Sequence, residues 1–446
     1  LDGEYHLFYQ YNPYGSMWGN MSWGHAVSTD LTSWTYLPVA LSPDSLGAIF
    51  SGSAVIDKDN TAGFGKDAMI AIFTSAGKVQ AQSIAYSTDK GRTFTKYAQN
   101  PVLPNPGITD FRDPKVSWNE LSGQWVMALA TKQTVTFFGS HNLKNWTKLS
   151  EFGEGIGSHA AVWECPDLFQ LSVDDNPLNK KWVLVVSINW NKEQYFIGNF
   201  DGKEFKLIEN HPKEALYVDK GLDYYASRTF RDYDNTLKTV STMGWVATWD
   251  YAPHVPSTYG KGFWSLPRDL ALKTFPEGLR MIQTPVKQLE QLRYDEISFQ
   301  HTLEMGVHRL PQFSPEENCY EMDVCFDVSS KNVFGFNLCV GEGRKVVISY
   351  DTESNSLLID RMNCTDASIP GFGRVAFAKV TPENNQLKMH IFVDKSSIEL
   401  FVNEGKDLFT LLTYPSEGQT GIEVFALQKG TSMKFKGWKL KPSSPY

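Results

Sequence analysis

The sequence has no long hydrophobic run, no excess of positive charge and no dense basic segment. Its apolar stretches, such as residues 182–188, have the length of strands and fall far short of the ~20 residues that span a bilayer, so we expect no transmembrane segment. The 42 Lys and Arg against 50 Asp and Glu give a formal net charge of −8. This balance argues against nucleic acid as a partner.

Cysteine and histidine are sparse and unpatterned. The five Cys form no CxxC pair, and the nine His show no HExxH spacing. An odd number of Cys without paired spacing predicts neither a disulfide framework nor a zinc site, and the scattered His give little support to any other metal site.

Aromatic residues are abundant at 13%, which favours sheets, and they take part in a repeat. An Asp or Asn recurs at intervals of 59, 53 and 59 residues, and an aromatic residue follows each one four or five positions later. Asx side chains initiate turns by accepting hydrogen bonds from nearby backbone amides, so each copy predicts a hairpin. The pairs are Asp30 and Trp34, Asp89 and Phe94, Asn142 and Trp146, and Asp201 and Phe205.

Strand-like segments keep step with these hairpins. Five apolar segments predict five units, at residues 5–11, 68–74, 124–130, 181–188 and 240–248. Units of about four strands with radial repetition predict an all-β chain with a five-bladed β-propeller over residues 1–289. A β-sandwich with coincidental hairpins is the alternative. After the repeat stops, short alternating strands predict a C-terminal β-sandwich over residues 290–446.

Four further segments precede apolar strands and are expected to be the innermost strands of blades two to five, at residues 50–57, 111–118, 163–169 and 223–230. Because innermost strands converge on the propeller axis, polar residues at their starts should face one another. By the same period, the innermost strand of blade one is expected upstream of Leu1.

Two carboxylates at the starts of innermost strands are candidates for chemistry. Asp113 stands between Arg112, whose guanidinium would keep it ionised, and Pro114, while Glu164 lies between apolar neighbours that should raise its pKa toward that of a general acid. Two carboxylates facing one axis suggest glycoside hydrolysis. The alternatives are a structural Arg–Asp pair and a buried, hydrogen-bonded Glu.

These residues belong to an ordered set of motifs that resembles glycoside hydrolase family thirty-two, the invertases, inulinases and levanases. The resemblance covers essentially the whole chain and is closest to bacterial levanases. The motifs are Tyr9-Gln-Tyr-Asn-Pro13, Trp18-Gly-Asn-Met-Ser-Trp23-Gly-His-Ala26, Phe50-Ser-Gly-Ser53, Phe111-Arg-Asp-Pro114, Trp163-Glu-Cys-Pro166, Ser265-Leu-Pro-Arg268 and Asp394-Lys-Ser-Ser-Ile-Glu-Leu-Phe401.

The resemblance implies a retaining mechanism on β-fructofuranosides, with no metal and no organic cofactor. It implies that Glu164 is the acid/base and that Asp113, with Arg112, grips fructose hydroxyls and stabilises the transition state. It also implies that several residues line a fructose pocket, although Trp18 and Trp249 could instead pack in blade cores. These are Gln10, Trp18, Phe50, Ser51 and Trp249.

The chain departs from the family pattern in three places. The Asn-Asp-Pro-Asn-Gly motif that carries the family's nucleophile is absent from the 446 residues, and we expect it upstream of Leu1. Tyr259-Gly-Lys261 stands where many members have Pro-Trp-Arg, and a Gly-rich loop is reduced to residues 189–195. These two changes leave endo and exo cleavage both open.

The sequence therefore predicts a fructan hydrolase that prefers levan and acts on a fructan or sucrose-type carbohydrate. A non-catalytic fructan-binding protein is the second reading, and an invertase or a fructosyltransferase is the third. Because a polymeric fructan does not cross membranes, we expect a secreted, periplasmic or cell-surface location.

Overall fold

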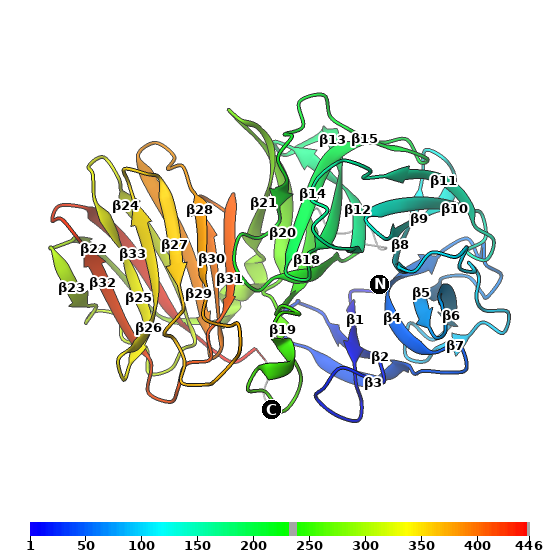
Figure 1. Cartoon of the computed structure of the whole chain (residues 1–446), viewed down its shortest axis with the longest axis horizontal. Coiled ribbons are helices and arrows are strands. Elements are labelled where there is room, and N and C mark those ends of the chain that lie inside the picture. The colour runs from blue at the N-terminus through cyan, green and yellow to red at the C-terminus, as the bar shows by residue number, and fades with distance from the viewer. Residues whose placement is uncertain (232–238, 444–446) are drawn as a thin grey trace. The chain divides into compact units, whose positions relative to one another are not determined.

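The computed structural model describes residues 1–231 and 239–443, and nearly all of its regular elements are strands (Figure 1). The chain divides into two compact units. The first contains Leu1–Val218, Ala226–Met243 and Leu270–Arg280, and the second contains Asp219–Tyr225, Gly244–Asp269 and Met281–Tyr446. The predicted boundary between residues 289 and 290 stays a prediction.

The strands before the C-terminal region form antiparallel sets in chain order. The first set is β1 (Tyr5–Tyr11), β2 (Ser22–Ser28) and β3 (Thr35–Leu41). The second is β4 (Ala48–Asp57), β5 (Ala68–Ala76), β6 (Gln80–Ser87) and β7 (Thr95–Lys96), and the third is β8 (Phe111–Asn119), β9 (Gln124–Thr131), β10 (Thr134–Ser140) and β11 (Thr147–Phe152).

The fourth set is β12 (Trp163–Val173), β13 (Asn176–Ile188), β14 (Lys192–Phe200) and β15 (Phe205–Leu207), with β16 (Leu216–Tyr217) paired to β14. The fifth is β17 (Tyr225–Thr229), β18 (Val240–Val246), β20 (Arg268–Phe275) and β21 (Gly278–Pro285), and β19 (Phe263–Trp264) pairs with β18. A single parallel pairing of Val173 on β12 with Leu272 on β20 joins the fourth and fifth sets into one ten-stranded sheet.

The predicted Asx turns join the second and third, or third and fourth, strands of the first four sets. Asp30 Oδ1 accepts hydrogen bonds from the backbone of Thr32 and Ser33, each at 2.8 Å. The side chains of Asp89, Asn142 and Asp201 likewise accept hydrogen bonds from backbone amides two to four residues later in the chain. The sequence period therefore reflects a true structural repeat.

The first strands of the second, third and fourth sets lie next to one another. The Ser53 hydroxyl on β4 donates to Pro114 O on β8 at 3.0 Å, and Asp113 on β8 accepts a hydrogen bond from the backbone of Cys165 on β12. Between neighbouring sets lie apolar cores, for example one around Ile70 and Met127 and another around Val126 and Leu184. The fold is thus the predicted β-propeller, and the five sets are consistent with five blades.

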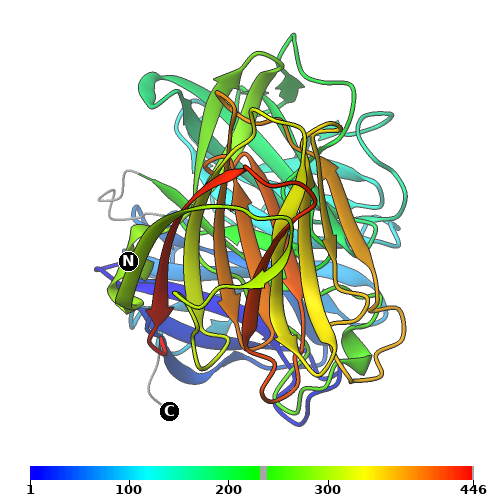
Figure 2. The ribbon, with the colours of Figure 1, turned by 90° about the vertical axis from the view of Figure 1, so that its left-hand side faces the viewer.

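The C-terminal strands form the predicted β-sandwich of two antiparallel six-stranded sheets (Figure 2). One sheet has the order β22 (Arg293–Thr302), β33 (Ser432–Leu440), β24 (Tyr320–Asp327), β29 (Gln386–Asp394), β30 (Ser397–Val402) and β31 (Asp407–Leu412). The other has the order β23 (Gly306–Arg309), β32 (Gly421–Ala426), β25 (Val333–Gly341), β26 (Arg344–Asp351), β27 (Ser356–Asp360) and β28 (Val375–Lys379). Alternate residues such as Met322, Val324 and Phe326 fill the core between the sheets.

Helices contribute little to the part of the chain that is described. They are two 3₁₀ segments, η1 (Ala252–His254) and η2 (Lys287–Leu292). Within residues 1–231 and 239–443, no helix has both the length and the apolar character needed to cross a membrane.

A mid-chain segment is built into the second unit. Lys220 and Leu222 donate backbone hydrogen bonds to Leu408 O and Thr410 O, so residues 219–223 run along β31. Asp223 binds the Arg361 guanidinium, the Tyr251 hydroxyl and the backbone of Leu412, and the Asp223 and Arg361 side chains are fully buried. This ion pair is satisfied by hydrogen bonds on every side, as burial of charge requires.

We predict that Arg361→Met lowers the free energy of unfolding by about 3–5 kcal/mol, because it leaves the Asp223 carboxylate buried without this cation. Chemical denaturation followed by tryptophan fluorescence measures the change. Lys331→Met is the matched control, since Lys331 pairs with Glu353 on the surface at 2.7 Å and should not shift the midpoint. Equal midpoints for wild type and Arg361→Met would contradict the prediction.

A buried histidine pair predicts acid sensitivity. His6 Nδ1 and His25 Nε2 lie 3.2 Å apart on β1 and β2, and burial lowers the pKa of His6 to about 4 and that of His25 to about 3. The unfolded chain, with histidine pKa values near ~6.5, therefore binds more protons, so stability present above that pH is lost as the pH falls toward 4. Urea unfolding between pH 7 and pH 4 should show a smaller decline in the free energy of unfolding for His25→Phe than for wild type. Identical declines in the two proteins would refute this prediction.

Candidate active site

A β-bulge occurs near the start of three first strands. In the pairing of β4 with β5, β8 with β9 and β12 with β13, the register shifts between Ile49 and Gly52, between Arg112 and Lys115, and between Glu164 and Asp167. Two residues therefore stand opposite one. The two residues that stand opposite one are Phe50 and Ser51 on β4, Asp113 and Pro114 on β8, and Cys165 and Pro166 on β12. Bulges re-aim side chains, and proline fits there because no ladder N–H is lost.

Arg112 joins the third and fourth sets of strands through Glu164. Its Nε and Nη2 atoms donate to Glu164 Oε1 at 3.1 and 3.0 Å, and its Nη1 pairs with Asp110. The side chains of Arg112 and Glu164 are only 8% and 14% exposed. Burial opposes the charge of Arg112, but Asp113, Glu164 and Asp110 together raise its pKa, so the guanidinium stays cationic.

Asp113 is fixed through its backbone and its side chain. Its φ of 65° lies in the left-handed region, where a non-glycine residue needs support. Its N–H donates to Thr74 Oγ1 at 3.0 Å, and its Oδ2 accepts the Cys165 N–H at 3.0 Å. The hydrogen bonds of Arg112 go to Glu164, Asp110 and Gln80, and its charge also interacts with that of the adjacent Asp113.

Sequence reasoning missed Asp110 and Gln80. Gln80 Oε1 accepts the Phe111 N–H at 2.8 Å and a longer bond of 3.4 Å from Arg112, while Gln82 Nε2 donates to Phe111 O at 2.8 Å. The two glutamines thus bond both backbone groups of Phe111, the first residue of β8. The alternation of Gln80 and Gln82 was the available signal, and Asp110 directly precedes the Phe-Arg-Asp-Pro motif.

The predicted sugar-binding residues fall into two groups. Gln10 is exposed and donates from Nε2 to Ile49 O at 2.9 Å, and the rings of Trp18 and Phe50 lie 6.1 Å apart edge to face. Trp18 is 61% exposed, and Ser51 is half-buried beside Phe50 in the β4 bulge. Trp249 belongs to the second unit, where it packs 5.1 Å from the Trp245 ring.

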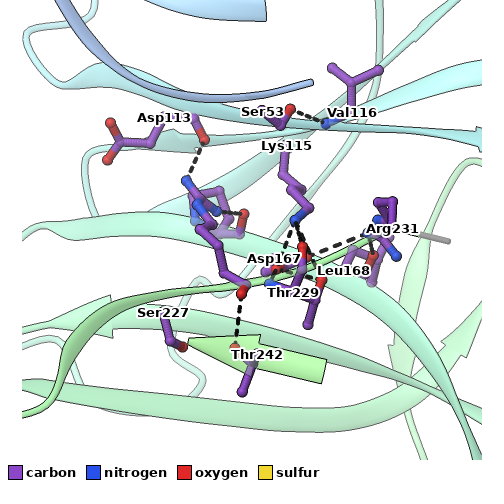
Figure 3. A network of polar contacts seen from close by, with 12 residues as sticks. Ser53, Asp113, Lys115, Val116, Asp167, Leu168, Ser227, Thr229, Arg231 and Thr242 are labelled. Carbon is purple, nitrogen blue, oxygen red and sulfur yellow. Dashed lines mark hydrogen bonds and ion pairs between the residues drawn. The ribbon is translucent and has the colours of Figure 1, made fainter. Parts of the chain in front are cut away.

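A buried ionic network continues along the same strands (Figure 3). Lys115 Nζ lies 3.0 Å from Asp167 Oδ2 and donates to Thr229 O at 2.8 Å, while Asp167 Oδ2 accepts the Thr229 N–H at 2.7 Å. Burial opposes the Asp167 charge, but Lys115 and Arg231 hold the pKa of this carboxyl below its usual value. The network ties β8, β12 and β17 together.

Groups of three or more His, Cys, Asp or Glu in an arrangement able to hold a metal ion do not occur among the described residues. The polar arrangement of Glu164, Arg112 and Asp113 instead offers a carboxyl group and a guanidinium on one strand pair, with a second carboxylate oriented by a backbone amide. Such a set can exchange a proton and bind hydroxyl groups.

Comparison with known proteins gives consistent matches. Residues 1–285 match the model of the Glycosyl hydrolases family 32 N-terminal domain, and residues 288–441 match Glycosyl hydrolases family 32 C terminal. A levanase of Bacillus subtilis (strain 168) is 46% identical over 97% of this chain, and a levanase of Bacillus sp. (strain L7) is 36% identical over 96%. The chain spans 66% and 48% of the length of these two relatives.

Solved structures agree. The exo-inulinase of Aspergillus awamori superposes with a TM-score of 0.90 at 31% identity, covering 99% of this chain and 94% of its own. The β-fructofuranosidase of Schwanniomyces occidentalis, solved with fructosyl-erythritol, gives 0.86 at 29% identity, covering 98% and 93%. With both family domains matched along nearly its full length, the chain belongs to glycosyl hydrolases family 32.

Proposed function

We propose that this protein is a retaining glycoside hydrolase that cleaves β-fructofuranosidic bonds of fructans, with levan as its preferred substrate. The observation that carries the proposal is the pairing of Glu164 with Arg112 next to an Asp113 carboxylate that is oriented by the Cys165 amide. Family membership and relatives named levanase support it.

In this proposal Glu164 is the acid/base. It protonates the leaving oxygen and later removes a proton from the attacking water, as retaining enzymes require. Arg112 holds Oε1 with two donors, so the position of this carboxyl oxygen is set before substrate arrives.

Asp113 and Arg112 are proposed to stabilise the transition state. The single orientation of the Asp113 carboxylate, given by the Cys165 N–H, suits it to accept hydrogen bonds from sugar hydroxyls that strengthen as positive charge develops on the ring. A retaining mechanism also needs a nucleophilic carboxylate ~5 Å from the acid/base, a role that we assign to neither Asp113 nor Glu164.

The binding residues are proposed to be Gln10, Trp18, Phe50, Ser51 and Trp249. The exposed indoles of Trp18 and Trp249 and the half-buried phenyl ring of Phe50 can pack against the apolar face of a sugar, and the Gln10 amide can bond a hydroxyl group. Trp18 and Phe50 are already in contact, which would give a preformed corner for one sugar ring.

We propose levan as the preferred substrate because two Bacillus relatives, 46% and 36% identical to this chain, are named levanases. An Aspergillus niger relative is named an extracellular exo-inulinase, and a polymeric substrate lies outside cells, so we propose a secreted, periplasmic or cell-surface location. Endo and exo cleavage, and transfer to a sugar in place of water, are outcomes of the test below.

The test is product analysis by chromatography after incubation of the natural gene product with levan, inulin and sucrose. We expect fructose or short fructose oligomers from levan at the highest rate. Oligomers would indicate endo cleavage and fructose alone exo cleavage. Binding of levan without release of any product would contradict hydrolysis and favour the fructan-binding alternative.

Glu164→Gln should lower turnover of levan by roughly 10²–10⁴-fold while sugar binding is retained, because the amide keeps the shape of the side chain but cannot donate the proton. Initial rates and calorimetric binding of a levan oligomer measure the two effects. Glu151→Gln on β11 is the control, since Glu151 is partly exposed and pairs with Lys148. Wild-type turnover in Glu164→Gln would refute the assignment.

A further inference from the structure

The bulges on β8 and β12 leave carbonyls that need partners, and Ser53 supplies one for Pro114 O but none for Asp113 O or Pro166 O. An inserted pair disrupts the ladder, so backbone carbonyls at a bulge need partners from elsewhere. Asp113 and Cys165 also adopt positive φ values of 65° and 49°, which are unfavourable for side-chain-bearing residues and persist only where the surroundings hold them.

Arg228 on β17 supplies these partners. Its Nη1 donates to Pro166 O and its Nη2 donates to Asp113 O at 3.4 Å, so one guanidinium bonds a carbonyl in each bulge. The planar fork of arginine makes this possible, because its two terminal nitrogens diverge at a fixed angle. A lysine ammonium could reach only one of the two carbonyls well.

The backbone that carries Arg228 is itself anchored. Its own carbonyl accepts a hydrogen bond from Thr242 Oγ1 at 3.0 Å, and the neighbouring Thr229 carbonyl accepts one from Lys115. On the other side, Ser227 N–H donates to the buried Glu193 carboxylate at 2.8 Å. Figure 3 shows the Thr242 and Lys115 contacts at this strand. The backbone on both sides of Arg228 is therefore held by hydrogen bonds, so the guanidinium extends from a fixed position on a strand.

The charge of Arg228 also suits its surroundings. Asp113, Asp167 and Glu193 lie near it. Burial raises the pKa of Glu193, and the positive charge of Arg228 makes this rise smaller. A cation at this point offsets the repulsion between carboxylates that two converging strands bring together.

We propose that Arg228 is a positioning residue for the site: by bonding both bulge carbonyls, it fixes the separation and orientation of the Asp113 and Glu164 carboxyl groups. The inference rests on the proposed function for its consequence in catalysis, but its geometric part stands independently. Loss of this clamp would let the two bulges relax separately, and misplacement by about 1 Å is enough to cost about 10²-fold in rate.

The experiment compares Arg228→Met, Arg228→Lys and Arg231→Met in the natural gene product. Arg231 is the matched control because it lies three residues away and bonds Asp167 and Leu168 O but neither bulge carbonyl. We expect Arg228→Met to lower kcat on levan by about 100-fold with KM changed less than about threefold. Arg228→Lys should recover part of the loss, and Arg231→Met should stay within a few-fold of wild type.

Equal losses of kcat in Arg228→Met and Arg231→Met, or no loss in either, would overturn the inference. A crystal structure of Arg228→Met is the second measurement, which does not depend on activity. We expect the contact between Asp113 Oδ2 and Cys165 N, 3.0 Å in the wild type, to be lost, and an unchanged contact would overturn the inference. If the wild type hydrolyses no fructan, the proposed function fails, and the crystal structure still decides whether Arg228 positions the bulges.

Discussion

The repeated bulge at the start of the first strands is the constraint on which the site depends. A regular strand would alternate its side chains across the sheet, whereas two residues opposite one change which face the following residues occupy. The bulge places Asp113 and Cys165 in left-handed conformations that cost about 1–3 kcal/mol each. Hydrogen bonds from Thr74 and between Asp113 and Cys165 offset this cost, so the strained backbone and the functional carboxylates are held by the same contacts.

Charge balance is the second requirement. Arg112 stands between Glu164 and Asp110, and Asp167 stands between Lys115 and Arg231, so each buried cluster contains both signs. Because an isolated buried charge is far more costly than a paired one, loss of Arg112 or of Lys115 would leave a buried carboxylate without its main cation and disturb the strands that carry it. The converging strands are thereby joined by ion pairs as well as by apolar packing.

Much of this arrangement could be predicted from the sequence, because local signals determine it. Asx turns depend on a side chain and the next few amides, and so Asp30 and its counterparts revealed the repeat and the propeller. The bond from Arg112 to Glu164 depends on how two strands 52 residues apart are aligned, which no local pattern of residues reveals. Arg228 acts on backbone carbonyls, and residue identity does not reveal where these lie in space.

The second unit shows the same limit in another form. Asp219 and Arg268 lie 191 and 142 residues before Thr410 in the chain, yet both form buried hydrogen bonds with this residue of β31 in the sandwich sheet. Gly221 allows this approach, since a Cβ at that position would lie 2.2 Å from Thr410 N. A sheet edge that would otherwise expose unpaired amides is thus covered by residues from the middle of the chain. The compact unit that contains the sandwich therefore also includes Asp219–Tyr225 and Gly244–Asp269, which chain order alone does not reveal.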